Sequence, residues 1–340
     1  MLGTMGRELW IDVLRAFACI CVLLVHSPAV YDGRIPGQFV LAPFNYVFMA
    51  WGVSIFFMIS GALLFTKEQQ LVPFFKKRFA RILVPTILWS LIYLIFIPIY
   101  EHSDINLFHK LFLLPFTPQY GLMWFMYALV GIYLITPMIS TWLSKATKND
   151  VEIVLAAWGI TLFFPYFELF DVSINNAIMP NGSLYYFYGF IGYSLLGYYL
   201  KTYNPIHLKS LTYIVLVIVA FSFPFIVFFS NWIPIKVLNS SQSISAALMS
   251  TIAFIFFQNI DYQKIENNKW FLKMIESFAA CSFGIYLLHM VFLYPLKHWL
   301  TSFHINYIIQ IPITALLVGV VSFAVVWFLS KNRVSKFLFG

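Results

Sequence analysis

Charged residues are scarce in this sequence: Asp, Glu, Lys and Arg together make up 10% of its 340 residues. A soluble globular chain carries about 25% charged residues, so this composition excludes an ordinary soluble domain. The alternation of polar and apolar residues that a transmembrane β-barrel requires is also missing. With 61% hydrophobic residues and a mean hydropathy of +0.84, the chain is predicted to be an all-α, polytopic membrane helical bundle.

Cysteine is rare as well, and Cys19, Cys21 and Cys281 all lie in apolar runs. Their positions predict neither a disulfide framework nor a metal site. The sequence also has no glycine-rich phosphate loop, zinc motif or nucleophile elbow. We therefore expect no permanently bound cofactor and no metal. No stretch has the composition of an appended soluble domain, which favours one integral membrane domain over residues 1–340.

Ten apolar segments have the length of a membrane span, and the loops between them alternate in positive charge. The segments are 9–28, 43–65, 82–100, 121–143, 151–170, 185–201, 210–230, 243–260, 277–298 and 307–329. One set of loops carries 16 of the 21 Lys and Arg residues and the other set carries 4. Cytoplasmic loops hold the excess of such residues, so about ten transmembrane helices with both termini in the cytoplasm are predicted. The same asymmetry explains the net charge of +8 without a nucleic-acid partner.

Two polar residues, Arg15 and His26, lie inside the first apolar segment. An arginine inside a membrane helix costs about 2.5 kcal/mol or more. Eleven residues are close to three helical turns, so both side chains project from nearly the same face, about 16 Å apart along the axis. The predicted orientation places Arg15 toward the cytoplasm and His26 toward the outside.

Two interpretations of this segment remain open. Asp12 precedes Arg15 by three residues, within reach of an ion pair, so the two can form a packing pair beside an interfacial His26. Alternatively, Arg15 holds an anionic or carbonyl-bearing ligand and His26 acts as a general base, a role that suits an imidazole. Ionisable groups in membrane helices usually mark a path or a site, which favours the second interpretation.

A basic cluster, Lys76, Lys77, Arg78 and Arg81, precedes the third apolar segment. Positive charge in a cytoplasmic loop is expected from topology alone, or from anionic lipids. However, Arg78 and Arg81 share a helix face, and paired guanidinium groups suit phosphates better than lysines do. A phosphate-bearing cytoplasmic ligand is therefore the functional alternative.

Two further candidates lie in later segments. His289 occurs in the ninth segment at a depth from which it can face His26, although a histidine in mid-helix is as often a hydrogen-bonded packing residue. Trp124 lies near the start of the fourth segment and is suited to stacking on a sugar, although the enrichment of aromatic residues at the membrane surface explains it equally well.

Several of these segments, in this order and spacing, resemble one known family. Arg15 followed by His26 after ten intervening residues, Phe56-Phe-Met-Ile-Ser-Gly61, and Arg78-x-x-Arg81 resemble its first three spans. The stretch Trp124 to Pro137, Phe190-Ile-Gly-Tyr193, and Phe283-Gly-Ile-Tyr-Leu-Leu-His289 are similar to later ones. The chain is thereby identified as a member of the acyltransferase-3 family of integral membrane acyltransferases.

This resemblance implies a multi-pass enzyme of the bacterial inner membrane. Such an enzyme moves an acyl group, acetyl or succinyl, from cytoplasmic acyl-CoA to a hydroxyl of a surface polysaccharide or lipid-linked glycan. It implies that His26 and Arg15 are the catalytic pair, and that Arg78, Arg81 and the adjacent Lys77 bind the donor. Residues expected on the substrate side are Asp12, Trp124, Tyr193 and His289. A polysaccharide exporter or flippase whose path is lined by Arg15 and His26 is the alternative.

Overall fold

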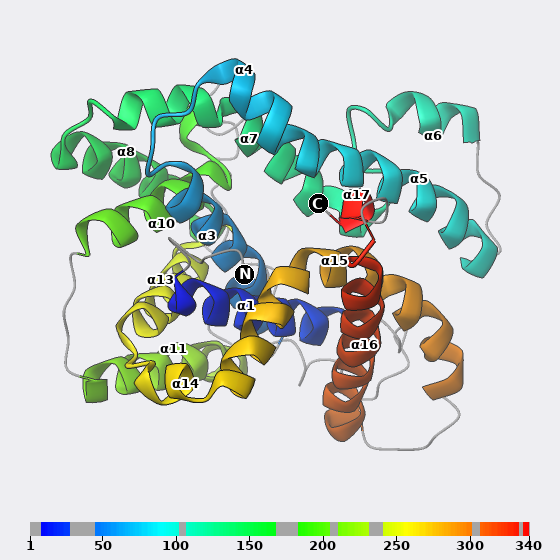
Figure 1. The fold of residues 1–340 in the computed structure, drawn as a ribbon. Helices are drawn as coiled ribbons and strands as arrows, with labels where there is room; N and C mark the ends of the chain where they lie inside the picture. Colours follow the sequence, from blue (N-terminus) through cyan, green and yellow to red (C-terminus); the bar gives the residue numbers. More distant parts are fainter. Residues whose placement is uncertain are drawn as a thin grey trace. The chain divides into compact units, whose positions relative to one another are not determined.

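The computed structural model describes residues 8–27, 45–101, 107–167, 183–204, 210–230, 241–300, 307–332 and 336–339. In these ranges the regular structure is entirely helical, with no β-strand (Figure 1). The chain forms two compact units. Unit 1 comprises Met1–Val25, Gly33–Thr66 and Ala146–Ala280, and unit 2 comprises His26–Asp32, Lys67–Lys145 and Cys281–Gly340. The boundary between them falls within helix α1 (Leu9–His26) and within helix α15 (Lys269–Leu300).

Both units are built from helices of very different lengths. Besides most of α1 and the start of α15, unit 1 contains η2 (Ala50–Ser54), α3 (Ile55–Leu64), α8 (Lys148–Thr161), α9 (Phe164–Phe167), η7 (Tyr185–Phe187), α10 (Ile191–Tyr203), α11 (Ser210–Ser230), α13 (Ile244–Asn259) and α14 (Gln263–Asn267). Unit 2 contains α4 (Leu71–Phe74), η3 (Phe75–Phe79), α5 (Ala80–Glu101), α6 (Leu107–Leu113), η4 (Gly121–Met123), α7 (Trp124–Leu143), α16 (Tyr307–Leu329) and α17 (Lys336–Phe339).

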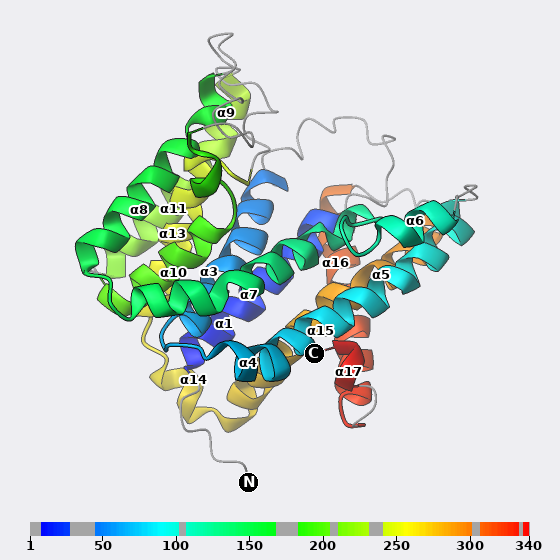
Figure 2. The ribbon, with the colours of Figure 1, turned by 90° about the horizontal axis from the view of Figure 1, so that it is seen from above.

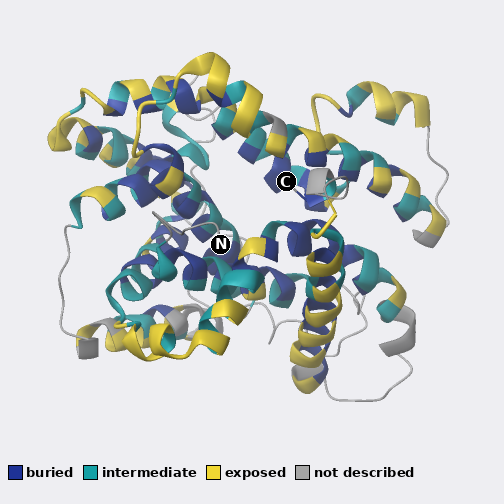
Figure 3. Ribbon diagram, in the orientation of Figure 1, coloured by how far each residue is buried: buried dark blue, intermediate teal, exposed yellow. Residues whose placement is uncertain are grey.

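The helices confirm the predicted polytopic membrane bundle. Among the described residues, seven helices are long and apolar enough to cross a membrane, and Ile244–Asn259 is a shorter apolar helix. The surface is apolar where a soluble protein would be polar: along α16, Leu316, Val320 and Phe328 are exposed, whereas Gln310 and Thr314 are buried. Figure 3 shows how much of this helix is exposed. This inside-out distribution is expected of helices whose outer faces contact lipid, and we conclude that the chain is a multi-pass membrane protein.

Two predicted segments differ from the helices that are present. The segment 185–201 was expected to be one helix, but the short 3₁₀ turn η7 is followed by Gly189 with a φ of 112° before α10 begins. Residues other than glycine rarely adopt this φ, so the backbone breaks there. Likewise, the segment 151–170 is helical only to Thr161 in α8, with the single turn of α9 beyond it.

The core of unit 1 depends on a very close approach of α3 and α10, which lie side by side in Figure 1. A β-carbon at Gly61 would lie 1.7 Å from the Ser194 carbonyl oxygen, and one at Gly197 would lie 2.0 Å from that of Met58. Small residues at such crossings let two membrane helices pack backbone to backbone. The two glycines therefore fix the spacing of this helix pair.

In unit 2, α4, η3 and α5 follow one another without a break from Leu71 to Glu101 (Figure 2). The indole of Trp89 on α5 donates a hydrogen bond of 2.8 Å to the carbonyl of Leu338 in α17. The phenol of Tyr93, one turn further along, donates to the carbonyl of Leu287 in α15 at 2.5 Å. These side-chain bonds tie α5 to both later helices.

Candidate active site

The beginning of α1 carries an ion pair between Asp12 and Arg15. Asp12 Oδ1 lies 3.5 Å from Arg15 Nη1, and the Asp12 side chain is 4% exposed while that of Arg15 is 27% exposed. A buried carboxylate needs a compensating charge, and Arg15 supplies it, so the predicted pairing is present. The buried position of Asp12 in the first turn is also favoured by the helix dipole.

At the other end of α1, His26 lies against His289 of α15. Both residues belong to unit 2, and their ring centroids are 5.0 Å apart with the ring planes inclined by 53°. The sequence placed the two at similar depths, and the fold brings their rings together. His26 occupies the last turn of α1, where the helix dipole stabilises a positive charge by about 0.3–1 kcal/mol.

Two hydrogen bonds anchor α15 in the turn that leads to His289. Tyr93 of α5 donates to the carbonyl of Leu287, and the phenol of Tyr286 donates to the carbonyl of Leu122 in η4. His289 itself is 1% exposed. Anchored backbone and close packing limit the movement of the ring, which is the condition for a preorganised catalytic or binding group.

The basic cluster, which is predicted to bind the acyl donor, lies on the continuous helical segment of unit 2. Lys76, Lys77 and Arg78 occupy the π-helical turn η3, and Arg81 follows in the first turn of α5. All four side chains are exposed, and none forms an ion pair with an acidic residue among the described parts of the chain. π-Helical turns occur frequently at functional sites. The cluster is therefore a set of accessible cations available to an anionic ligand.

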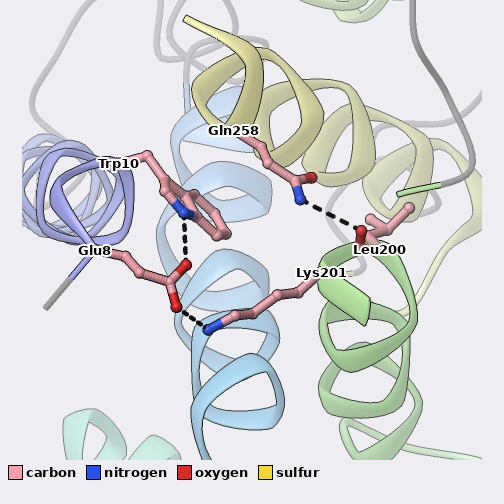
Figure 4. A network of polar contacts seen from close by, with 5 residues as sticks. All are labelled: Glu8, Trp10, Leu200, Lys201 and Gln258. Atoms are coloured by element: carbon pink, nitrogen blue, oxygen red, sulfur yellow. Dashed lines mark hydrogen bonds and ion pairs between the residues drawn. The ribbon is translucent and has the colours of Figure 1, made fainter. Parts of the chain in front are cut away.

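Lys201 shows what a compensated lysine looks like in the same protein. Its ammonium forms an ion pair with Glu8, whose other carboxylate oxygen accepts a 2.8 Å hydrogen bond from the indole of Trp10 (Figure 4). Nearby, the side-chain amide of Gln258 donates to the carbonyl of Leu200 at 3.4 Å. Lys201 thus links the start of α1 to the end of α10, and its charge is already neutralised.

Two further predicted residues are Tyr193 in unit 1 and Trp124 in unit 2. Tyr193 is fully buried in unit 1, where its phenol donates a 2.6 Å hydrogen bond to the carbonyl of Ser241. Trp124 begins α7 in unit 2 and is partly exposed, with its ring edge-on to Phe125.

Unit 1 also contains a buried hydroxyl cluster that the sequence does not predict. The phenols of Tyr46 and Tyr166 each lie 2.5 Å from the hydroxyl oxygen of Ser245, and that oxygen lies 3.2 Å from the hydroxyl of Ser243. The local pattern of serines does signal the cap of α13, because Ser243 accepts a hydrogen bond from the backbone N–H of Ala246. The tyrosines come from distant segments, and nothing in their own sequence surroundings indicates the cluster.

The fold and these groups define a class: a multi-pass helical membrane protein with a histidine pair inside its bundle and an exposed basic cluster on one of its helical segments. The family model described as an acyltransferase domain, acyltransferase-3, matches residues 8–331. The chain belongs to this family and is a membrane acyltransferase. Comparison with curated proteins gave no match, and comparison with solved structures gave none.

Proposed function

We propose that this protein transfers an acyl group, acetyl or succinyl, from cytoplasmic acyl-CoA to a hydroxyl of a surface polysaccharide or lipid-linked glycan. We also propose that the protein resides in the inner membrane of a bacterium. The observation that carries the proposal is the pairing of His26 with His289 within the bundle of a family member. Membrane helices rarely place two titratable rings in contact without a use for them.

His26 is the general base of the proposed reaction. It takes the proton of the acceptor hydroxyl as the hydroxyl oxygen attacks the thioester carbonyl. The C–S bond then breaks, and the departing sulfur takes that proton back from His26, so coenzyme A leaves as the thiol and His26 is again neutral. The position of His26 in the last turn of α1 supports this role, because the helix end stabilises the imidazolium that forms. Holding both substrates in line beside His26 converts an encounter in solution into a reaction between neighbours, which can lower the barrier by several kcal/mol.

The basic segment supports acyl-CoA as the donor. Coenzyme A combines a polyanionic nucleotide end with a long, nearly neutral arm that ends in the thioester. Arg78, Arg81 and Lys77 are exposed and form no ion pair with an acidic residue that the structure describes. They are therefore available to its phosphates, for which guanidinium groups provide two-pronged hydrogen bonding. In the predicted orientation the arm would extend along α1, past Arg15, toward His26.

The test is transfer by the purified protein in lipid nanodiscs, supplied with radiolabelled acetyl-CoA and membranes from cells that lack the gene. Wild type should release free thiol and label a glycan fraction. His26→Ala should reduce both by at least about a hundredfold, the usual contribution of acid–base catalysis. His109→Ala, on the exposed face of α6, is the matched control and should remain active.

Two results would overturn the proposal. Full activity of His26→Ala would remove the base from the mechanism. Glycan movement across proteoliposomes without any thiol release would indicate instead an exporter whose path is lined by Arg15 and His26.

A further inference from the structure

His289 has a defined tautomer. Its Nδ1 lies 2.6 Å from the carbonyl oxygen of Tyr286, one turn earlier in α15. A carbonyl oxygen can only accept a hydrogen bond, so Nδ1 carries the proton. In the neutral ring, Nε2 is therefore the unprotonated nitrogen and presents a lone pair.

This Nε2 atom is buried and has no hydrogen-bond partner among the residues that the structure describes. Leaving a buried polar atom unsatisfied costs about 1–3 kcal/mol, and each such atom in a native protein requires an explanation. Histidine is not needed to fill space here, since an apolar residue of similar size would pack without that cost. Nε2 is thus a hydrogen-bond acceptor for which the described residues supply no donor.

The lone pair is located where an acceptor substrate must arrive. The His289 ring lies 5.0 Å from that of His26, centroid to centroid, and the phenols of Tyr93 and Tyr286 are already committed to carbonyl oxygens. A hydroxyl has a single proton, so the hydroxyl that gives its proton to His26 cannot also donate to His289. The donor for His289 must be a second group of the substrate.

We propose that His289 binds the acyl acceptor by accepting a hydrogen bond at Nε2 from a second hydroxyl or N–H group, next to the hydroxyl that is acylated. This inference rests on the proposed function and restricts it. The acceptor is a polyol or amino-polyol with neighbouring donors, such as a sugar ring, and a simple alcohol is a poor substitute. His289 is a positioning and specificity residue that exchanges no proton in the reaction.

Two substitutions separate this role from a structural one. In His289→Asn the side-chain amide can keep the hydrogen bond to the Tyr286 carbonyl but offers nothing at the position of Nε2. In His289→Gln the amide oxygen can reach the position of Nε2 but the bond to Tyr286 is lost. A binding role predicts that the Gln variant transfers better than the Asn variant, and a structural role predicts the reverse order.

The experiment measures transfer from radiolabelled acetyl-CoA to the glycan of gene-deleted membranes, together with the thermal shift that acetyl-CoA induces in each purified variant. His289→Asn should lose at least about tenfold in glycan labelling, because a missing substrate hydrogen bond costs roughly 1.4 kcal/mol or more, while its thermal shift with acetyl-CoA stays that of wild type. His109→Asn is the matched control.

Three outcomes are informative. Loss of labelling with an intact acetyl-CoA shift, partly restored in His289→Gln, supports the inference. Normal labelling by His289→Asn overturns it. Absence of thiol release and labelling in wild type would instead refute the proposed function, and the two failures are therefore distinguishable.

Discussion

Removing Arg15 tests whether this arginine serves the fold or the reaction. Asp12 Oδ1 lies 3.5 Å from Arg15 Nη1, and the Asp12 side chain is 4% exposed. At an effective dielectric constant of about 20, two unit charges at this distance interact with about 5 kcal/mol. Because Arg15 is partly exposed, we expect Arg15→Gln to destabilise the protein by about 3 kcal/mol, the lower end of the range for breaking a buried pair.

The matched control is Lys148→Gln, which breaks an ion pair with Glu152 at the same distance, 3.5 Å, but with side chains 49% and 44% exposed. An exposed pair contributes at most about 1 kcal/mol. The apparent melting temperature of the Lys148→Gln variant in nanodiscs should therefore differ little from that of wild type. The Arg15→Gln variant should have a clearly lower melting temperature. The double variant Asp12→Asn/Arg15→Gln should regain most of that loss, because it no longer buries a carboxylate at position 12 without Arg15.

Activity of the double variant decides between the two roles. If Arg15 acts on the donor, Asp12→Asn/Arg15→Gln should fold but release thiol from acetyl-CoA far more slowly than wild type. Wild-type thiol release by the double variant would refute this reasoning and leave Arg15 as the packing partner of Asp12. Equal melting temperatures of Arg15→Gln and Lys148→Gln would refute the burial argument itself.

Further predictions concern the core, the donor cluster and the topology. Gly61→Ala should abolish accumulation of folded protein because its β-carbon meets a carbonyl oxygen at 1.7 Å, whereas Gly131→Ala, with open space around it, should gain up to about 1 kcal/mol from helix propensity. Arg78→Gln/Arg81→Gln should raise the KM for acetyl-CoA about tenfold or more with little change in kcat, and salt should raise the wild-type KM. The native cysteines are buried, so a membrane-impermeant maleimide should react only with a cysteine introduced at the surface. It should label the Lys110→Cys variant on intact cells and the Arg78→Cys variant only after permeabilisation. The opposite labelling pattern would show that the predicted orientation is wrong.

Much of this protein could be predicted from its sequence because membrane insertion is governed by composition. Long apolar runs must become helices that satisfy their own backbone in lipid, and the distribution of Lys and Arg predicts an orientation. The 3.6-residue period placed Asp12 within reach of Arg15, and the pair is present. The ordered motifs also identified the family, which the match to residues 8–331 confirms.

The tertiary structure decided which residues meet. The contact of His26 with His289 joins residues 263 positions apart in the chain, and no local pattern encodes such a distance. The protonated Nδ1 and unsatisfied Nε2 of His289 follow from one carbonyl oxygen and from the absence of a donor around the ring in the described residues. Periodicity can place a residue on a helix face, but hydrogen-bond satisfaction depends on every neighbour that packing brings near, and only the folded chain supplies those neighbours.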